Sequence, residues 1–207
     1  MKQLKVLVVE DESLISLSLS DQLRGLGHEV VGAAQNGSEA IDMAERFDPD
    51  LIIMDIKMPG VDGLEAAKTI NHRKVTPIIF LTGYSNEEMA RKAGESGAFA
   101  YLSKPVDQRE LVPAIEIALG RFREVMKLKE EISYLEESLE ARKVIERAKG
   151  IVMKRYRLSE AEAMLRMQKT SRDQNIKLVE LAKSIIFSEK LQNGLSEKRT
   201  EGRAKSR

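Results

Sequence analysis

The sequence predicts an α/β domain built on a parallel sheet, followed by a smaller all-helical part. Three observations support this prediction. Residues 1–120 alternate five times between a short apolar run and a stretch with helical spacing. The stretch from Ala114 to about Arg157 has no proline and carries apolar residues at alternating intervals of three and four. The region after Arg142 is rich in Lys and Arg and contains two helix-start patterns.

Five apolar runs in residues 1–120 are predicted to form buried strands. Runs of this length, bounded by turn residues, are typical of parallel strands that are covered on both faces. The helices between them are predicted to begin near Ser13, at Asn36 or Ser38, at Leu64, near Asn86 and at Asp107. The runs are residues 6–9, 30–34, 51–54, 78–81 and 99–102.

Composition and length limit the class of protein. The 207 residues suffice for one ordinary domain and a smaller module. There is no cysteine, which excludes disulfides, thiol nucleophiles and Cys-ligated metals. No apolar stretch approaches the ~20 residues of a membrane helix, and the N-terminal apolar run is too short for a signal peptide. We therefore expect a cytoplasmic protein that does not contact a membrane.

The charge is divided unequally along the chain. Residues 1–120 hold 12 Lys and Arg against 19 Asp and Glu, a net charge of −7, whereas residues 121–207 hold 22 against 14, a net charge of +8. This division indicates two modules with different partners, and it makes nucleic acid a candidate partner for the second. The alternative is an ordinary solvated surface of Lys and Arg.

Chemically active side chains stand where four of the predicted strands end. They are Glu10 and Asp11, Asp55, Thr82, and Lys104. Because the carboxyl ends of parallel strands form the edge where ligands bind, we expect these side chains to share one pocket. Each residue alone could serve a turn or a helix cap, so the combination carries the argument.

The predicted pocket suits phosphoryl transfer. A hard divalent cation such as Mg²⁺ would relieve the repulsion between clustered carboxylates. The cation and Lys104 could neutralise charge that develops on a phosphoryl group passed to Asp55. Thr82 could then donate a hydrogen bond to a phosphoryl oxygen.

Residues 1–120 resemble the receiver domain of two-component response regulators. The resemblance rests on Glu10-Asp11, on Asp55 within the segment 54–63, on Thr82-Gly83 and on Lys104-Pro105. It implies a flavodoxin-like sheet with strand order 2-1-3-4-5. It also implies that Asp55 accepts a phosphoryl group from a sensor histidine kinase.

The resemblance implies roles for further residues. Mg²⁺ would be bound by Asp11, Asp55 and the backbone carbonyl of Lys57, with Glu10 acting mainly through bound water. Phosphorylation would draw Thr82 toward the phosphoryl group while Tyr101 turns inward. A cis peptide bond is expected before Pro105. Beyond self-phosphorylation and slow self-dephosphorylation at Asp55, we expect no enzymatic activity.

Residues 121–141 are predicted to form a coiled-coil linker. The apolar seam is Val125, Leu128, Ile132, Leu135 and Leu139. In a parallel dimer Glu124 would face Lys129 favourably, whereas Glu131 would face Glu136 unfavourably. A homodimer through this seam is the leading interpretation, and the alternative is one amphipathic helix that packs on its own protein.

Residues 142–192 are predicted to form a three-helix module, followed by a disordered basic tail over residues 193–207. The module holds 13 Lys and Arg against 6 Asp and Glu. Capping-box patterns beginning at Ser159 and at Ser171 divide it into a helix that ends near Arg157, one over 160–170 and one over 172–190.

This module, with the linker, resembles the ANTAR domain, whose members bind RNA hairpins and antiterminate transcription. The most distinctive segment is Ala148-Lys149-Gly150. The family usually has Leu-Arg where this chain has Met167-Gln168, and Ala in place of Thr170. The further matching residues are Arg142, Ile145, Ile151-Val152-Met153, Ser159, Glu162-Ala163, Asn175, Lys177-Leu178 and Ala182.

Five residues are candidates for contact with RNA. They are Lys149, Lys169, Arg172, Asn175 and Lys177. Gly150 inside a helix costs about 1 kcal/mol relative to Ala, so a close helix or RNA approach is expected there. Few aromatic residues lie in this half, which argues against an aromatic base-stacking platform like that of an RRM domain.

Two other functions remain open at this point. A DNA-binding transcription factor would place Arg172, Gln174 and Asn175 at the start of a recognition helix. A regulator that acts only through protein contacts would make the positive charge incidental.

Overall fold

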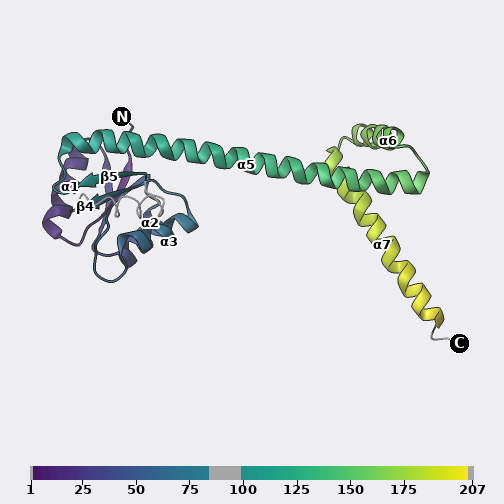
Figure 1. The fold of residues 1–207 in the computed structure, drawn as a ribbon, viewed down its shortest axis with the longest axis horizontal. Coiled ribbons are helices and arrows are strands. Elements are labelled where there is room, and N and C mark those ends of the chain that lie inside the picture. The colour runs from purple at the N-terminus through teal and green to yellow at the C-terminus, as the bar shows by residue number, and fades with distance from the viewer. Residues whose placement is uncertain (1, 84–98, 205–207) are drawn as a thin grey trace. The chain divides into compact units, whose positions relative to one another are not determined.

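The computed structural model describes residues 2–83 and 99–204, with side chains described through residue 191. The chain divides into two compact units, residues 1–127 and 128–207. The division falls inside helix α5 (Gln108–Tyr156). The first unit contains the sheet and the second is helical (Figure 1).

The first unit is built on a parallel sheet of five described strands. They are β1 (Lys5–Val9), β2 (Glu29–Ala34), β3 (Leu51–Asp55), β4 (Ile78–Thr82) and β5 (Ala100–Ser103). The strand order is β2-β1-β3-β4-β5, which confirms the predicted flavodoxin-like order. Asp55 pairs in register with Leu81, and Thr82 pairs with Ser103, so the carboxyl ends of three strands meet at one edge.

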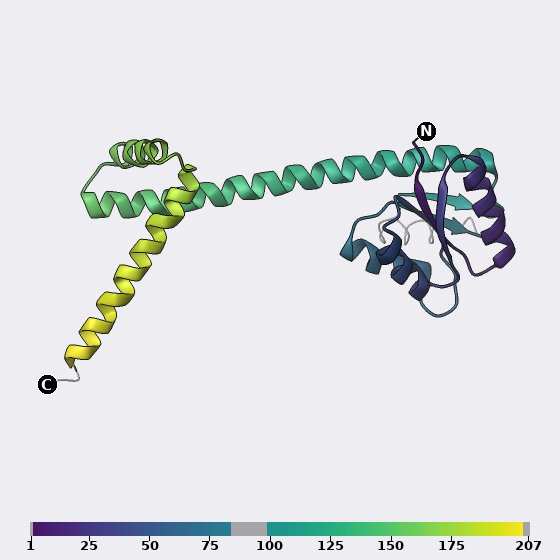
Figure 2. The same ribbon diagram turned by 180° about the vertical axis from the view of Figure 1, so that it is seen from behind.

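Helices cover both faces of this sheet (Figures 1 and 2). The sheet has a hydrophobic core on each face, and the residues of β1 contribute to the two cores alternately. Val6 and Val8 belong to one core, and Leu7 and Val9 belong to the other. Helix α1 (Ser13–Gly25) and the first turns of α5 cover the first face. Helices α2 (Gly37–Phe47) and α3 (Gly63–Arg73) cover the second. The helix predicted to begin near Asn86 lies outside the described residues.

Burial of β3 explains its continuous apolar run. Its apolar residues Leu51, Ile52, Ile53 and Met54 are fully buried. Burying an apolar side chain of this size contributes about 1.5–3 kcal/mol relative to leaving it exposed. A strand with both faces covered therefore carries no alternation of polar residues, and the carboxylate at its end marks where the core gives way to the pocket.

Two contacts fasten α5 to the start of β5. Nη1 of Arg121 donates a hydrogen bond to the carbonyl oxygen of Phe99 at 3.0 Å. The rings of Phe99 and Phe122 meet edge to face, with 5.8 Å between centroids and an angle of 76°. Such aromatic pairs contribute about 0.5–1.5 kcal/mol beyond their buried area. The helix is thus held to the sheet just before it continues into the linker.

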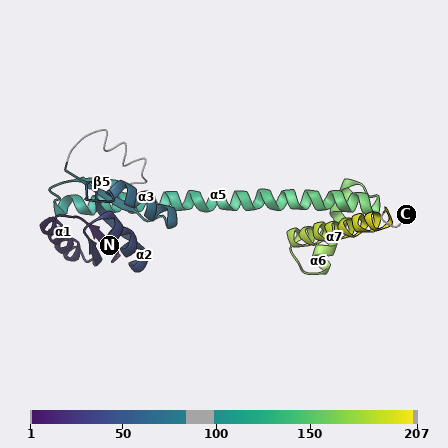
Figure 3. The same cartoon turned by 90° about the horizontal axis from the view of Figure 1, so that it is seen from below.

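The second unit packs the end of α5 against α6 (Glu160–Asp173) and α7 (Leu178–Ala204) (Figure 3). The capping box predicted at Ser159 is confirmed at the start of α6. The Ser159 hydroxyl accepts from the backbone N–H of Glu162, and the Glu162 carboxylate accepts from the N–H of Ser159. The buried core of this unit is Ala148, Val152, Ala163, Met167, Leu181 and Ala182.

The second predicted helix start, at Ser171, is wrong. Ser171 lies inside α6, and its Oγ donates to the carbonyl oxygen of Ile176 at 2.6 Å. Asn175 makes the reversal with a φ of 52°, a backbone conformation that Asn tolerates better than most residues. A Ser followed three residues later by Gln can therefore occur at a helix end as well as at a helix start.

The predicted end of the last helix, near residue 190, is also wrong. The structure continues α7 to Ala204, through most of the predicted disordered tail. Gly194 alone does not stop the helix, because one interior glycine costs only about 1 kcal/mol. The surrounding Lys, Glu and Arg residues are good helix formers.

The close helix–helix approach that was one expectation at Gly150 is not found, while the alternative, an approach of RNA, stays a prediction. A Cβ built there would meet no heavy atom within 4 Å in the described part of the chain. None of the helices in the described ranges combines the length and apolarity needed to cross a membrane.

Candidate functional site

Asp55 lies at the head of a cavity of about 210 Å³ at the carboxyl edge of the sheet. It is the last residue of β3 and only 6% exposed. The cavity brings together residues from four strand ends, as the sequence predicts. Its lining is Asp11, Glu12, Asp55, Ile56, Lys57, Thr82, Gly83 and Lys104.

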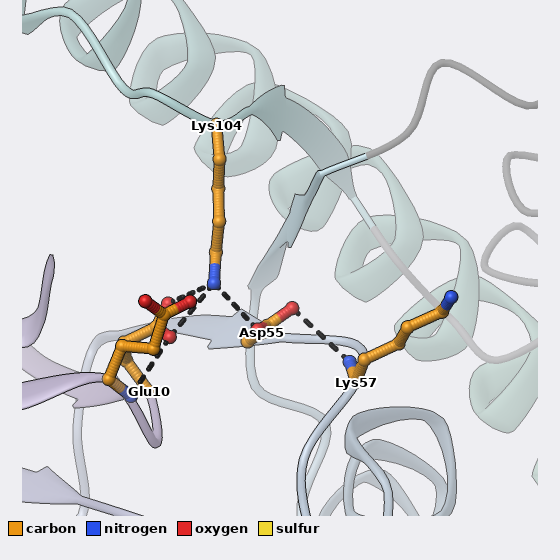
Figure 4. Close-up of polar contacts among 5 residues, drawn as sticks. Glu10, Asp55, Lys57 and Lys104 are labelled. Atoms are coloured by element: carbon orange, nitrogen blue, oxygen red, sulfur yellow. Dashed lines mark hydrogen bonds and ion pairs between the residues drawn. The ribbon is translucent and has the colours of Figure 1, made fainter.

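Lys104 bridges two carboxylates in this cavity (Figure 4). Its Nζ lies 2.6 Å from Oδ2 of Asp55 and 2.6 Å from Oε2 of Glu10. Burial of Lys104 favours the neutral amine, but its hydrogen bonds to Asp55 and Glu10 outweigh that effect and raise its pKa. Lys104 is therefore a fixed positive charge beside Asp55.

Glu10 is fully buried at the floor of the site. Burial raises its pKa despite the hydrogen bond from Lys104, because a carboxylate loses solvation in this position. The nearby charge of Asp55 acts in the same direction. A second positive charge near the site, besides that of Lys104, would stabilise the ionised form of Glu10.

The acidic residues fit a hard divalent cation. One carboxylate oxygen from each of Glu10, Asp11 and Asp55 lies within 4.8 Å of the others. Such cations prefer oxygen ligands and keep several waters, which the exposed side of Asp11 allows. Lys57 also lines the cavity, and its backbone N–H donates to Oδ1 of Asp55 at 3.2 Å.

Gly63 lies in the segment that carries the receiver resemblance, but the sequence analysis assigned it no role in the site. Its N–H donates to the carbonyl of Ile56 at 2.9 Å, which closes the loop after β3. A Cβ on Gly63 would lie 2.1 Å from the backbone oxygen of Asp55, so only glycine fits. The signal was present as two glycines in the Pro59–Gly63 turn, where Gly60 has a φ of +79°.

The two predicted switch residues occupy different environments. Thr82 lines the cavity at the end of β4. Tyr101 lies on β5, and 36% of its surface is exposed. Partial burial raises the pKa of its phenol. The peptide bond between Lys104 and Pro105 is cis, as expected from the resemblance.

The five candidate RNA contacts fall into two groups. Lys149 is buried and ion-paired with Glu146 and Glu160. The other four are exposed near the end of α6 and in the turn before α7: Lys169, Arg172, Asn175 and Lys177. The DNA-binding interpretation would require Arg172 and Asn175 to lie at the start of a helix. Instead, Arg172 lies in the last turn of α6 and Asn175 lies in the turn before α7.

The second unit also contains a cavity that the sequence analysis missed. It is about 210 Å³ in volume and lies among α5, α6 and α7. Beside it the guanidinium of Arg166 stacks over the ring of Tyr156, with 4.0 Å from Cζ to the ring centroid. The sequence pattern predicts that Tyr156 and Arg166 both lie on helices. It does not predict their contact, because they are ten residues apart and a turn separates the two helices.

Comparisons with known proteins match both units. A family model described as response regulator receiver domain matches residues 6–116, and one described as ANTAR domain matches residues 134–186. The receiver domain of a modulated diguanylate cyclase from Desulfovibrio desulfuricans superimposes with a TM-score of 0.54 and 36% identity. It covers 58% of this chain and 96% of that one.

Full-length relatives extend the match. Transcriptional regulatory protein PdtaR from Mycobacterium tuberculosis is 41% identical over 182 residues, which cover 88% of this chain and 89% of that protein. Transcriptional regulatory protein BtsR from Salmonella typhi is 37% identical over 143 residues, covering 69% of this chain and 57% of that protein. The chain therefore belongs to the two-component response regulators, and within them to those that join a receiver domain to an ANTAR domain.

Proposed function

We propose that this protein is a phosphorylation-controlled antiterminator. A sensor histidine kinase transfers a phosphoryl group to Asp55, and the ANTAR module then binds a hairpin in nascent RNA. The observation that carries the first half is the position of Lys104, whose ammonium lies between the carboxylates of Asp55 and Glu10.

The chemistry at Asp55 follows from its surroundings. A carboxylate oxygen of Asp55 attacks the phosphorus of a phosphohistidine, forming a P–O bond while the P–N bond breaks and the imidazole nitrogen departs with the electron pair. Lys104 neutralises charge on the phosphoryl oxygens. Asp11, Asp55 and the Lys57 carbonyl would hold Mg²⁺, with Glu10 acting through water; the ion would supply further charge neutralisation.

Phosphorylation changes the partners available to Lys104. In the unmodified site its ammonium satisfies two carboxylates at once. A phosphoryl group on Asp55 adds three acceptor oxygens that compete for it. The Thr82 hydroxyl, on the wall of the same cavity, donates to one of these oxygens, and Tyr101 turns inward as Thr82 moves.

The exposed basic residues support the RNA half of the proposal. Lys169, Arg172 and Lys177 lie within nine residues of one another on the end of α6 and the following turn. They would neutralise phosphates, and Asn175 would reach a base edge or a sugar hydroxyl. Such binding is expected to weaken steeply as salt rises.

The linker supports a homodimer. Four seam residues are more than half exposed although they are aliphatic: Leu128 at 58%, Ile132 at 54%, Leu135 at 53% and Leu139 at 59%. Their spacing is that of a coiled coil, in which each would fill a hole on a second copy. A dimer would present two RNA-binding modules at once.

Gel-shift assays with paired short hairpins test the proposal. The protein is compared with and without beryllofluoride and Mg²⁺, alongside Asp55→Ala and duplex DNA at the same salt. We expect hairpin binding that depends on loop sequence and strengthens with the phosphoryl mimic, except in Asp55→Ala. Binding that ignores both loop sequence and the state of Asp55, or that prefers duplex DNA, contradicts the proposal.

A further inference from the structure

We propose that the cavity beside Tyr156 and Arg166 receives one unpaired base of the bound RNA. This inference rests on the proposed RNA-binding function and assigns a position on the module to one nucleotide. The base would enter a cavity formed by all three helices of the unit. Its lining is Ile151, Val152, Arg155, Tyr156, Arg166, Met167, Thr170, Leu181 and Ile185.

The stacked pair at this cavity suits a nucleobase. Tyr156 is 47% exposed, and the Cζ of Arg166, itself an exposed residue, lies over its ring at 4.0 Å from the centroid. Unpaired RNA bases stack on aromatic rings and on the planes of Arg guanidinium groups. Together the two groups offer a base an aromatic ring and a guanidinium to stack on, and the cation is itself attracted to the ring.

The cavity walls match the rest of a base. Met167 and Ile185 contribute apolar surface, which suits the flat faces of a purine or pyrimidine. The Thr170 Oγ donates to the carbonyl of Arg166 at 3.0 Å, which leaves its oxygen lone pairs to accept from a base amino group. The volume of about 210 Å³ suits one base.

Charge complementarity favours RNA over an apolar protein side chain as the occupant. Residues 142–192 carry a net charge of +7, and Arg166 lines the cavity, as does Arg155, which is ion-paired with Glu189. A base brings its phosphate with it, so a cavity on a module of net positive charge favours a nucleotide. The exposed Lys169 and Arg172 lie farther along the same helix, where neighbouring phosphates would be bound.

This site differs from the extended platform that the sparse aromatic content excludes. One aromatic ring and one guanidinium read a single nucleotide, whereas surface lysines contact every phosphate alike. The proposal therefore predicts dependence on one loop position, which phosphate contacts alone would not produce.

A base-deletion experiment on the full chain tests this assignment. A pool of short hairpins with a randomised loop is bound to the wild-type protein with beryllofluoride and Mg²⁺. In the tightest-binding hairpin, each loop nucleotide is replaced in turn by an abasic residue. Affinities are measured for wild type, Tyr156→Leu, Tyr156→Phe, Arg166→Lys and the control Tyr134→Leu, an exposed tyrosine in the linker.

One abasic position should weaken wild-type binding about tenfold, since stacking contributes about that much per base. This loss of affinity on base removal should disappear in Tyr156→Leu and become smaller in Arg166→Lys. Arg166→Lys keeps the positive charge, so the salt dependence of its RNA binding should stay that of the wild type. Tyr156→Phe and Tyr134→Leu should retain it. Circular dichroism verifies folding, and Arg166→Lys alone decides the outcome if Tyr156→Leu unfolds.

The outcomes separate the two proposals. An unchanged abasic profile in both Tyr156→Leu and Arg166→Lys overturns the base pocket while hairpin binding by the wild type stands. If the wild type enriches no hairpin from the pool, the RNA-binding function fails and the pocket assignment fails with it.

Discussion

The ammonium of Lys149 lies 2.6 Å from Oε1 of Glu160, so a residue near the end of α5 is tied to the first residue of α6. A second carboxylate, on Glu146, lies 2.6 Å from the same nitrogen. The hydrogen bond to Glu146, followed by that to Glu160, raises the pKa of Lys149. Its side chain is only 10% exposed, which indicates a structural role at the junction of two helices.

Lys149→Met should therefore act through folding. The variant leaves two carboxylates without their cation and loosens the start of α6, so the thermal midpoint of the helical module should fall. Differential scanning calorimetry measures it, with Lys183→Met as control, because Lys183 pairs with Glu180 on an exposed face. An unchanged midpoint combined with weak hairpin binding would instead make Lys149 a direct RNA contact.

Gly63→Ala should destabilise the receiver by about 3 kcal/mol or more, since the added methyl group would collide with the backbone of Asp55. Urea denaturation of the full chain measures the loss. Gly83→Ala is the matched control, because a Cβ there meets no heavy atom of the described residues within 4 Å. Equal stability of the two variants would show that the loop after β3 can move away.

Lys104→Met should make the stability of the receiver depend on Mg²⁺. Without the ammonium, Glu10 and Asp55 repel each other in a nearly buried site, at a cost of about 3–5 kcal/mol. Thermal unfolding with and without Mg²⁺ should show a larger stabilisation by the ion than in wild type. Lys68→Met, on the exposed side of α3, should respond to Mg²⁺ as wild type does.

His28 predicts a loss of stability in mild acid. Burial, aided by the N-terminal charge, lowers its pKa below the ordinary 6.5. Between the folded pKa and 6.5 the unfolded chain binds a proton that the folded chain does not, so the free energy of unfolding falls as pH drops through that window. The contribution is fully present above pH 6.5.

Urea unfolding at pH 7.5 and 5.5 measures this difference. His28→Asn should reduce it while keeping an acceptor for the backbone N–H of Leu4, which the Nδ1 of His28 now accepts at 3.4 Å. His72→Asn, an exposed position, serves as the control. The assignment to His28 is wrong if the pH difference persists in His28→Asn and vanishes in His72→Asn.

A Leu128→Lys, Leu135→Lys double variant should be monomeric. Each seam leucine buried in a dimer contributes about 1.5–3 kcal/mol, so losing both weakens association more than about a hundredfold. Sedimentation velocity compares it with Tyr134→Lys, which lies off the seam and should dimerise as wild type does. A monomeric wild type at all concentrations would instead rule out the coiled coil.

The receiver pocket was predictable because its residues stand at strand ends. Asp55, Thr82 and Lys104 each follow an apolar run, and parallel strands place such positions at one edge whatever the loops do. No knowledge of side-chain packing was needed. The chemistry could therefore be inferred from order and residue type alone.

The helical module was predicted less completely because its contacts are not periodic. The burial of Lys149 depends on Glu160, which is brought close by a turn, and the stacking of Arg166 on Tyr156 depends on the same turn. Ser171 shows that a capping pattern does not specify which end of a helix it marks. These relationships required the relative placement of three helices.

The attachment of α5 to the sheet lies only a few residues along the chain from the pocket around Asp55. Phe99, whose carbonyl Arg121 binds, and Lys104, which binds Asp55, are the two ends of a single six-residue stretch around β5. Extended chain that is hydrogen-bonded to a parallel neighbour, as β5 is to β4, can lengthen little along its axis. If phosphorylation of Asp55 draws Lys104 to new partners, as proposed, either the six residues absorb the displacement or the contacts of Phe99 with α5 shift with it.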